Sequence, residues 1–218
     1  MGWHRVAIAV AASLLGAGAH AGDAASDRPL RYPAADLLPV AEGVTTIDLA
    51  GDGRPAAVVR YRQAEADVPG WRSEPILFLL GTGGAGDWLS LQRFAGLDRN
   101  GAPRLQGFSF VADACTETDL RLVRQPHGPP LVVVAERVFV GADGKHLESD
   151  NLDSPAPMFF SVYDLTPLAD LAVPRGAGEA EDILVYQLVR KVRAAGLYCS
   201  LDEAFARELA APGEAAKP

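Results

Sequence analysis

The chain contains little cysteine and little histidine, and this scarcity excludes several common kinds of site. Two cysteines among 218 residues cannot build a cysteine-dense scaffold or a four-cysteine zinc site. Two of the four histidines lie near the N-terminus, which leaves His127 and His146 to the rest of the chain. They form neither a three-histidine zinc set nor a His-Glu-x-x-His helix. Because Ser-x-x-Lys and Gly-x-Ser-x-Gly are also missing, we expect no enzymatic activity, no cofactor and no bound metal.

An excess of positive charge is lacking as well. The 28 acidic side chains outnumber the 20 basic ones and give a formal charge of −8. A broad phosphate-binding surface needs clustered lysine and arginine, so we expect no nucleic-acid partner. The remaining balance, 49% hydrophobic and 22% charged, is typical of a globular protein.

The first 21 residues resemble a secretory signal. Arg5 precedes a short apolar run, and Ala19 and Ala21 are spaced as signal peptidase requires. The run of about a dozen residues is shorter than the ~20 that a membrane-spanning helix needs, which disfavours an uncleaved anchor. We therefore predict cleavage after Ala21, export to the periplasm and no membrane span afterwards. The most apolar later stretch, 131–140, is interrupted by Glu136 and Arg137.

Export also bears on the two cysteines. An oxidising compartment lets a pair persist as a disulfide, so we predict a bond between Cys115 and Cys199. Two free thiols are the alternative.

Composition divides the rest of the chain. Residues 22–43, rich in proline, alanine and aspartate, are expected to form an extended lead-in that packs only through Leu37, Leu38 and Val40. Residues 44–210 should form a single domain, and 211–218 a flexible tail.

Most of the domain has the pattern of β-strands. The segments rich in β-branched and aromatic residues, separated by turn residues, are 44–49, 57–62, 75–80, 88–94, 107–112, 119–124, 131–140 and 158–165. The pattern predicts a mainly β (α+β) fold of antiparallel sheets, sandwich-like, or a curved sheet with a helix packed on it. Residues 183–193 fit a helix or a strand, and we favour a strand.

One short C-terminal helix is clearly signalled. Ser200 is a good N-cap, and Glu203 follows three residues later as in a capping box. Leu201, Ala204, Phe205 and Leu209 would line its buried face.

Two glycine-rich segments imitate ligand loops. Asp48–Gly53 resembles part of a calcium loop, but Ala50, Ala56 and Val59 stand where oxygen ligands are needed, so a hairpin turn is favoured. Gly81–Gly86 satisfies Gly-x-Gly-x-x-Gly, yet a strand-like segment follows it instead of a helix, which favours a hairpin loop over a dinucleotide site.

Charged residues within strands are the remaining candidates for a site. Asp119 and Arg121 lie two apart and project from one face, whereas Glu136 and Arg137 point to opposite faces. An arginine on a half-buried face can bind a carboxylate of a ligand or of its own neighbour, here Asp119.

Five segments together resemble the CarG-like carbapenem self-resistance proteins, a family of small exported bacterial proteins. The segments are GVTTIDLAGDGRPAAVVRYR, Cys115 with the following TETDLRLV, LVVVAERVF, FFSVYDL, and YCSLDEAF from Tyr198. The chain departs from the family pattern at Gln63–Pro69 and at Ala114. The resemblance implies protection from a carbapenem in the periplasm by non-hydrolytic binding or protection of a target.

The candidate ligand-binding residues under this resemblance are Arg121, Arg137 and Asp119. A carbapenem carries a carboxylate, which Arg121 or Arg137 would bind, and Asp119 lies beside Arg121 on the same strand face. A periplasmic protein–protein interaction module without a small-molecule ligand is the alternative function.

Overall fold

A computed structural model describes residues 30–64, 72–83, 86–112, 118–137, 155–171 and 183–211. The strands are β1 (Leu37–Pro39), β2 (Gly43–Thr46), β3 (Ala56–Arg60), β4 (Gln63–Ala64), β5 (Arg72–Gly81), β6 (Trp88–Leu97), β7 (Pro103–Gln106), β8 (Phe108–Ala112), β9 (Asp119–Val123), β10 (Leu131–Arg137), β11 (Ala156–Pro167) and β12 (Leu184–Tyr198). The helical turns are η1 (Ala34–Asp36), η3 (Leu168–Asp170), α1 (Leu201–Ala204) and the π-helical η5 (Phe205–Leu209). The predicted strands are confirmed, and 184–198 is a strand, as favoured.

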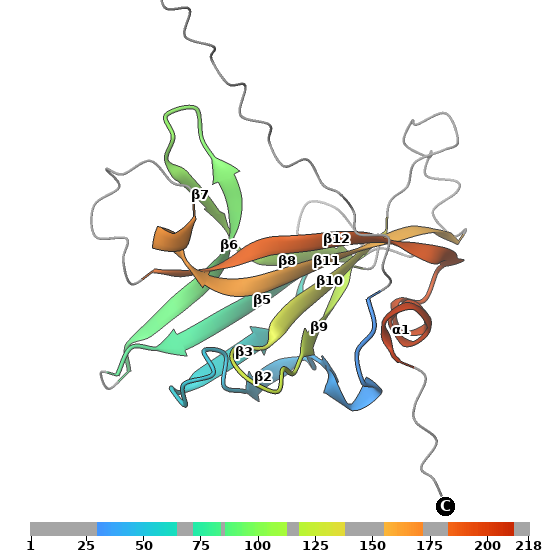
Figure 1. The fold of residues 1–218 in the computed structure, drawn as a ribbon, viewed down its shortest axis with the longest axis horizontal. Helices are drawn as coiled ribbons and strands as arrows, with labels where there is room; N and C mark the ends of the chain where they lie inside the picture. Colours follow the sequence, from blue (N-terminus) through green and yellow to red (C-terminus); the bar gives the residue numbers. More distant parts are fainter. Residues whose placement is uncertain are drawn as a thin grey trace, which may run out of the picture.

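The strands form one sheet that curls into a half-barrel (Figure 1). Its order is β1-β9-β10-β11-β12-β6-β5-β3-β2, while β4 and β8 pair with β5 and β7 pairs with β6. The expectation of antiparallel, sandwich-like sheets is therefore wrong in two respects. The described strands form a single sheet, and it is mixed, because β12 pairs with β6 in parallel through Val185↔Gln92 and Tyr186↔Arg93. The 15-residue β12 pairs with β11 on one side and β6 on the other, so it connects the two parts of the sheet that a sandwich would hold as separate layers. The curved-sheet alternative describes the fold.

The two faces of the sheet carry two separate apolar cores. Along β10, Val132 and Val134 join the larger core, whereas Val133 and Ala135 join the other, as strand alternation requires. The larger core fills the inside of the curl with aromatic rings in tilted and edge-on contact. Phe78 lies 5.0 Å from Tyr186 between ring centroids. Side chains fill the interior, so ligand sites must be sought at the surface.

The second core lies beneath the C-terminal helical segment. Leu201, Ala204, Phe205 and Leu209 are all buried there, which confirms the predicted face. Ser200 is the N-cap, and its Oγ accepts a hydrogen bond from the Glu203 N–H at 3.3 Å. The segment therefore begins where the sequence indicates and packs against the outer face of the sheet.

The N-terminal described segment docks on the end of this helix. The Tyr32 N–H donates to the Leu209 carbonyl at 2.8 Å, and the Ala211 N–H donates to the Tyr32 carbonyl at 2.7 Å. Arg31 Nη1 donates to the carbonyls of Arg207 and Glu208, both at 2.6 Å, and so satisfies groups that a helix end leaves unpaired. The lead-in thus contributes more than Leu37, Leu38 and Val40, because Leu30 is also buried.

Glu208 fixes the helix to the end of β12. Its carboxylate accepts hydrogen bonds from the Gly196 N–H at 2.9 Å and the Tyr198 hydroxyl at 2.7 Å. Burial pulls the pKa of Glu208 upward, but these hydrogen bonds outweigh it, so the pKa lies below its ordinary value. The ionised form therefore stabilises this contact.

Several sequence predictions lie outside the described residues. The signal segment 1–21, the tail from Pro212 onward, His146 and Cys115 are all there, so the cleavage and the disulfide stay predictions. Cys199 is exposed, directly before the helix. Across the described ranges, no helix combines the length and apolar character that crossing a bilayer requires.

Candidate functional site

Side chains, rather than a backbone ladder, join the two ends of the curled sheet. β3 and β9 lie near opposite ends of the strand order. Arg60 on β3 crosses the gap, and its Nη1 donates to Asp119 Oδ1 on β9 at 2.7 Å and to the Val40 carbonyl at 3.0 Å. We call this junction the seam. One arginine therefore ties together segments that share no strand pairing.

Glu74 anchors the β5 side of the seam. Its side chain is only 9% exposed, and Oε2 accepts bonds from Arg60 Nε at 3.1 Å and Nη2 at 2.5 Å. Oε1 accepts from Arg62 Nε at 3.0 Å. Burial disfavours the charge on Arg60, but Glu74 and Asp119 outweigh burial and raise the pKa of Arg60 above its usual value. The buried carboxylate is thus paired on both oxygens, as its burial demands.

Arg121 carries the network from the seam to the helix. Its guanidinium makes ion pairs with Asp119 and with Asp202, and it lies over the Phe205 ring at 4.5 Å from the centroid. Arg121 is 8% exposed, whereas the Asp202 side chain is 85% exposed. The charged network therefore reaches the surface at Asp202, on the first turn of α1.

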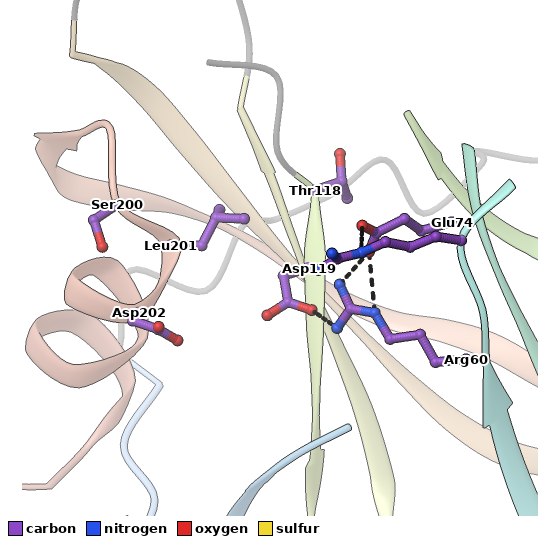
Figure 2. A pocket seen from close by; sticks show the side chains of 8 residues that line it. Arg60, Glu74, Thr118, Asp119, Ser200, Leu201 and Asp202 are labelled. Carbon is purple, nitrogen blue, oxygen red and sulfur yellow. Dashed lines mark hydrogen bonds and ion pairs between the residues drawn. The ribbon is translucent and has the colours of Figure 1, made fainter. Parts of the chain in front are cut away.

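A polar pocket of about 190 Å³ opens above this network, and we call it the seam pocket. Figure 2 shows Ser200, Leu201 and Asp202 on one side, Thr118 and Asp119 on β9 in the middle, and Arg60 and Glu74 on the other side. Arg62 completes the lining. Three distant parts of the sequence thus meet around one hollow.

Arg62 is the group in the seam pocket best placed to receive an anion. Its side chain is 55% exposed, and its Nε is held by Glu74. Glu42 lies 3.7 Å from the same Nε, and within the described ranges no hydrogen bond to either terminal nitrogen is found. These two nitrogens form the planar fork that matches a carboxylate.

The other side of the pocket adds hydroxyls and an acceptor. Ser200 Oγ accepts from the helix, so its O–H is left to donate, and Thr118 adds a second hydroxyl. Asp202 binds Arg121 through Oδ1 and presents an exposed carboxylate to the pocket mouth. A ligand that carries a carboxylate and a hydrogen-bond donor would find a partner for each group.

The structure places the three sequence-predicted residues on the same face of neighbouring strands. Asp119 pairs in register with Ala135, and Arg121 with Val133, so Arg137 lies two residues beyond the partner of Asp119. Asp119 lines the seam pocket, whereas Arg121 is buried beneath Asp202 and Phe205 and Arg137 is 9% exposed. The internal ion pair between Asp119 and Arg121, one of the two readings of the sequence, is present.

Arg60 and Glu74 were missed, although the sequence holds a signal for both. Arg60 follows Ala56 and Val58 at the positions of β3 that face the larger core, and Glu74 precedes Ile76 at the equivalent positions of β5. A charge where the alternation predicts an apolar core residue indicates a buried partner. Asp202 gave no such signal, because it is an exposed residue in a first helical turn.

The two glycine-rich segments are turns. Asp48 Oδ1 and Oδ2 accept the N–H groups of Gly51 at 2.7 Å and Gly53 at 3.0 Å, so this carboxylate serves the turn between β2 and β3. Gly81 ends β5, which pairs antiparallel with β6, so the hairpin reading is confirmed. His127 is exposed in a loop, and no group of three or more possible metal-ligating side chains occurs in the described ranges.

Fold and site together define a mainly β half-barrel protein with one short helix and a polar pocket at its seam. No protein-family model matches this chain, and no curated protein matches it in sequence. Among solved structures it is similar to one described as the crystal structure of CarG, with a TM-score of 0.51 and 18% identity. The match covers 78% of this chain and 95% of that chain. At this identity the similarity establishes a distant CarG-like fold relationship.

Proposed function

We propose that this protein is an exported, CarG-like binding protein that holds a carboxylate-bearing small molecule, a carbapenem, in the seam pocket and leaves it chemically intact. Under this proposal it acts in the periplasm, lowers sensitivity to the antibiotic by binding, and is not an enzyme. The observation that carries the proposal is the exposed guanidinium fork of Arg62 in a pocket of a CarG-like half-barrel.

The lining also holds Glu74, Asp119 and Asp202, but all three are paired with arginines, so the exposed fork of Arg62 is the group that supports a carboxylate as the recognised ligand group. Arg62 would receive it through its two terminal nitrogens, and the Thr118 and Ser200 hydroxyls would bind neighbouring acceptors. Arg121 then acts as a positioning residue, because it holds Asp119 and Asp202 at the pocket. The volume of about 190 Å³ is below the ~300 Å³ of the smaller drug-sized sites, so part of the ligand stays outside.

A titration of the secreted protein with a carbapenem tests the proposal directly. We expect saturable binding, an unchanged β-lactam absorbance over time, and binding about fivefold weaker in Arg62→Ala, since an ion pair to an exposed arginine contributes up to about 1 kcal/mol. Arg99→Ala is the matched control, because Arg99 is also exposed, lies in the turn between β6 and β7, and does not line the pocket.

Expression in a carbapenem-sensitive host completes the test. Protection with an intact ring supports the proposal, whereas protection with ring opening would make the protein an enzyme. Absence of binding and of protection would refute the carbapenem role. Equal binding by the parent and by Arg62→Ala would show that the ligand binds outside the seam pocket.

A different observation favours the alternative function as a protein–protein interaction module. On the outer face of the sheet, Val44, Val59 and Leu77 lie side by side on β2, β3 and β5. Val44 is 70% exposed and Leu77 is 37% exposed. Apolar side chains in such a row are a surface that a partner protein could cover. This function predicts no stabilisation by a carbapenem and no change in susceptibility.

A further inference from the structure

We propose that a second pocket, beside the ends of β3 and β9 that lie away from the seam pocket, binds a small amphipathic monocarboxylate. This loop pocket lies between the turn after β2 and the loop from β9 to β10. It has a volume of about 290 Å³ and is lined by Ile47, Asp48, Gly51, Arg124, Gln125, Gly128 and Pro130. It shares no residue with the seam pocket, so this proposal and the proposed carbapenem binding can be tested independently.

Hydrogen bonds within each of the two loops stabilise both walls of the loop pocket. The Asp48 carboxylate holds its turn through the N–H groups of Gly51 and Gly53. On the other wall, Gln125 Nε2 donates to the Pro129 carbonyl at 2.5 Å and closes that loop on itself. A ligand would therefore meet a preformed hollow and would not have to order either loop.

A close approach of two glycines sets the distance between the walls. Gly51 has a φ of +70°, and a Cβ built there would lie 2.7 Å from the carbonyl carbon of Gly128. Backbone thus contacts backbone at this point, and only glycine fits.

The lining combines an apolar floor with one cationic group. Ile47 packs against the larger core and Pro130 is buried, so the floor offers apolar surface. The Arg124 side chain is 62% exposed, and its ion-pair partner Asp36 lies at 3.9 Å, beyond hydrogen-bond distance. An incoming carboxylate can replace this loose contact with a bidentate one.

The neighbouring acid does not oppose an anion strongly. Asp48 is exposed, but both of its oxygens already accept backbone N–H groups, which offset its charge locally. The volume suits a short chain: an apolar body of a few carbons on the floor and a carboxylate at Arg124. The ligand class that satisfies both parts of the lining is a short-chain amphipathic monocarboxylate.

Three probes separate the two requirements. In a titration followed by backbone amide NMR shifts, hexanoate should move the signals of residues 47–51 and of Arg124, Gln125, His127 and Gly128. Acetate lacks the apolar body and should bind at least about tenfold more weakly than hexanoate. Hexanol lacks the charge and should also bind more weakly than hexanoate. Arg124→Ala should weaken hexanoate binding about fivefold, as expected for an exposed ion pair. Arg99→Ala, with an exposed arginine on a distant turn, should bind hexanoate like the parent.

The outcomes are decisive in either direction. Hexanoate shifts confined to the two loops and weakened in Arg124→Ala support the site. Equal binding of acetate and hexanoate would show simple ion pairing and overturn the proposal, as would equal binding by parent and Arg124→Ala. The Gly51→Ala variant gives a second check, because its Cβ must push the loops apart and should weaken hexanoate binding while circular dichroism reports whether the sheet is retained. Loss of carbapenem binding in Arg62→Ala has no bearing on these results.

Discussion

Replacement of Arg60 by methionine tests whether side chains close the half-barrel. Methionine keeps much of the aliphatic volume but removes the donors to Glu74, to Asp119 and to the buried Val40 carbonyl. Removing one partner from a buried ion pair costs about 3–5 kcal/mol. Glu74 keeps Arg62 and Asp119 keeps Arg121, so we place the loss near the lower end, at about 3 kcal/mol.

The assay is urea and thermal unfolding of parent and variant. A loss of about 3 kcal/mol corresponds to a midpoint lowered by about 6–12 °C in a domain of this size. The matched control is Arg54→Met, because the pair between Arg54 and Asp52 has side chains 42% and 46% exposed and should contribute nothing measurable. Equal midpoints for the two variants would refute the idea that Arg60 holds the ends of the sheet together.

Three further predictions concern the helix and its surroundings. Glu208→Gln should destabilise most above the ordinary glutamate pKa of 4.5, and this penalty should shrink as the pH falls, because the folded pKa is depressed; unfolding curves at neutral and acidic pH would show it. Ser200→Ala should cost about 1 kcal/mol through the lost N-cap, measured by urea unfolding, and an unchanged midpoint would contradict the capping role. Cys115 and Cys199 should resist alkylation in denatured, unreduced protein, and Cys199→Ser should lower stability by about 2–5 kcal/mol; two alkylatable thiols would rule the disulfide out.

Local patterns predicted the elements well, but not how the sheet closes. Alternation along 131–137 and the cap at Ser200 are set by neighbouring residues, so they can be read from the sequence. The parallel pairing of Val185 with Gln92 joins positions far apart in the chain, and nothing in either segment specifies that partner. A sandwich and a curled sheet bury the same alternating faces, so the pattern alone could not distinguish them.

The site was predicted only in part for a similar reason. Asp119 and Arg121 were selected because they share one strand face, and the structure places them in contact. Arg62 could not be recognised, since an exposed arginine near a strand end is common and its importance comes from the pocket that Thr118 and Ser200 complete. Which charges meet depends on the curl of the sheet, which is a property of the whole fold.

The docking of the segment at Tyr32 on the helix end has a consequence for the order of folding. The hydrogen bonds between Tyr32 and residues 209–211 join parts of the chain that are synthesised far apart in time. Closing so long a loop is entropically costly, and such contacts slow folding. Residues 201–211 follow all of the described strands in the chain, so the second core, which includes Leu201, Phe205 and Leu209, stays incomplete until these residues have left the ribosome.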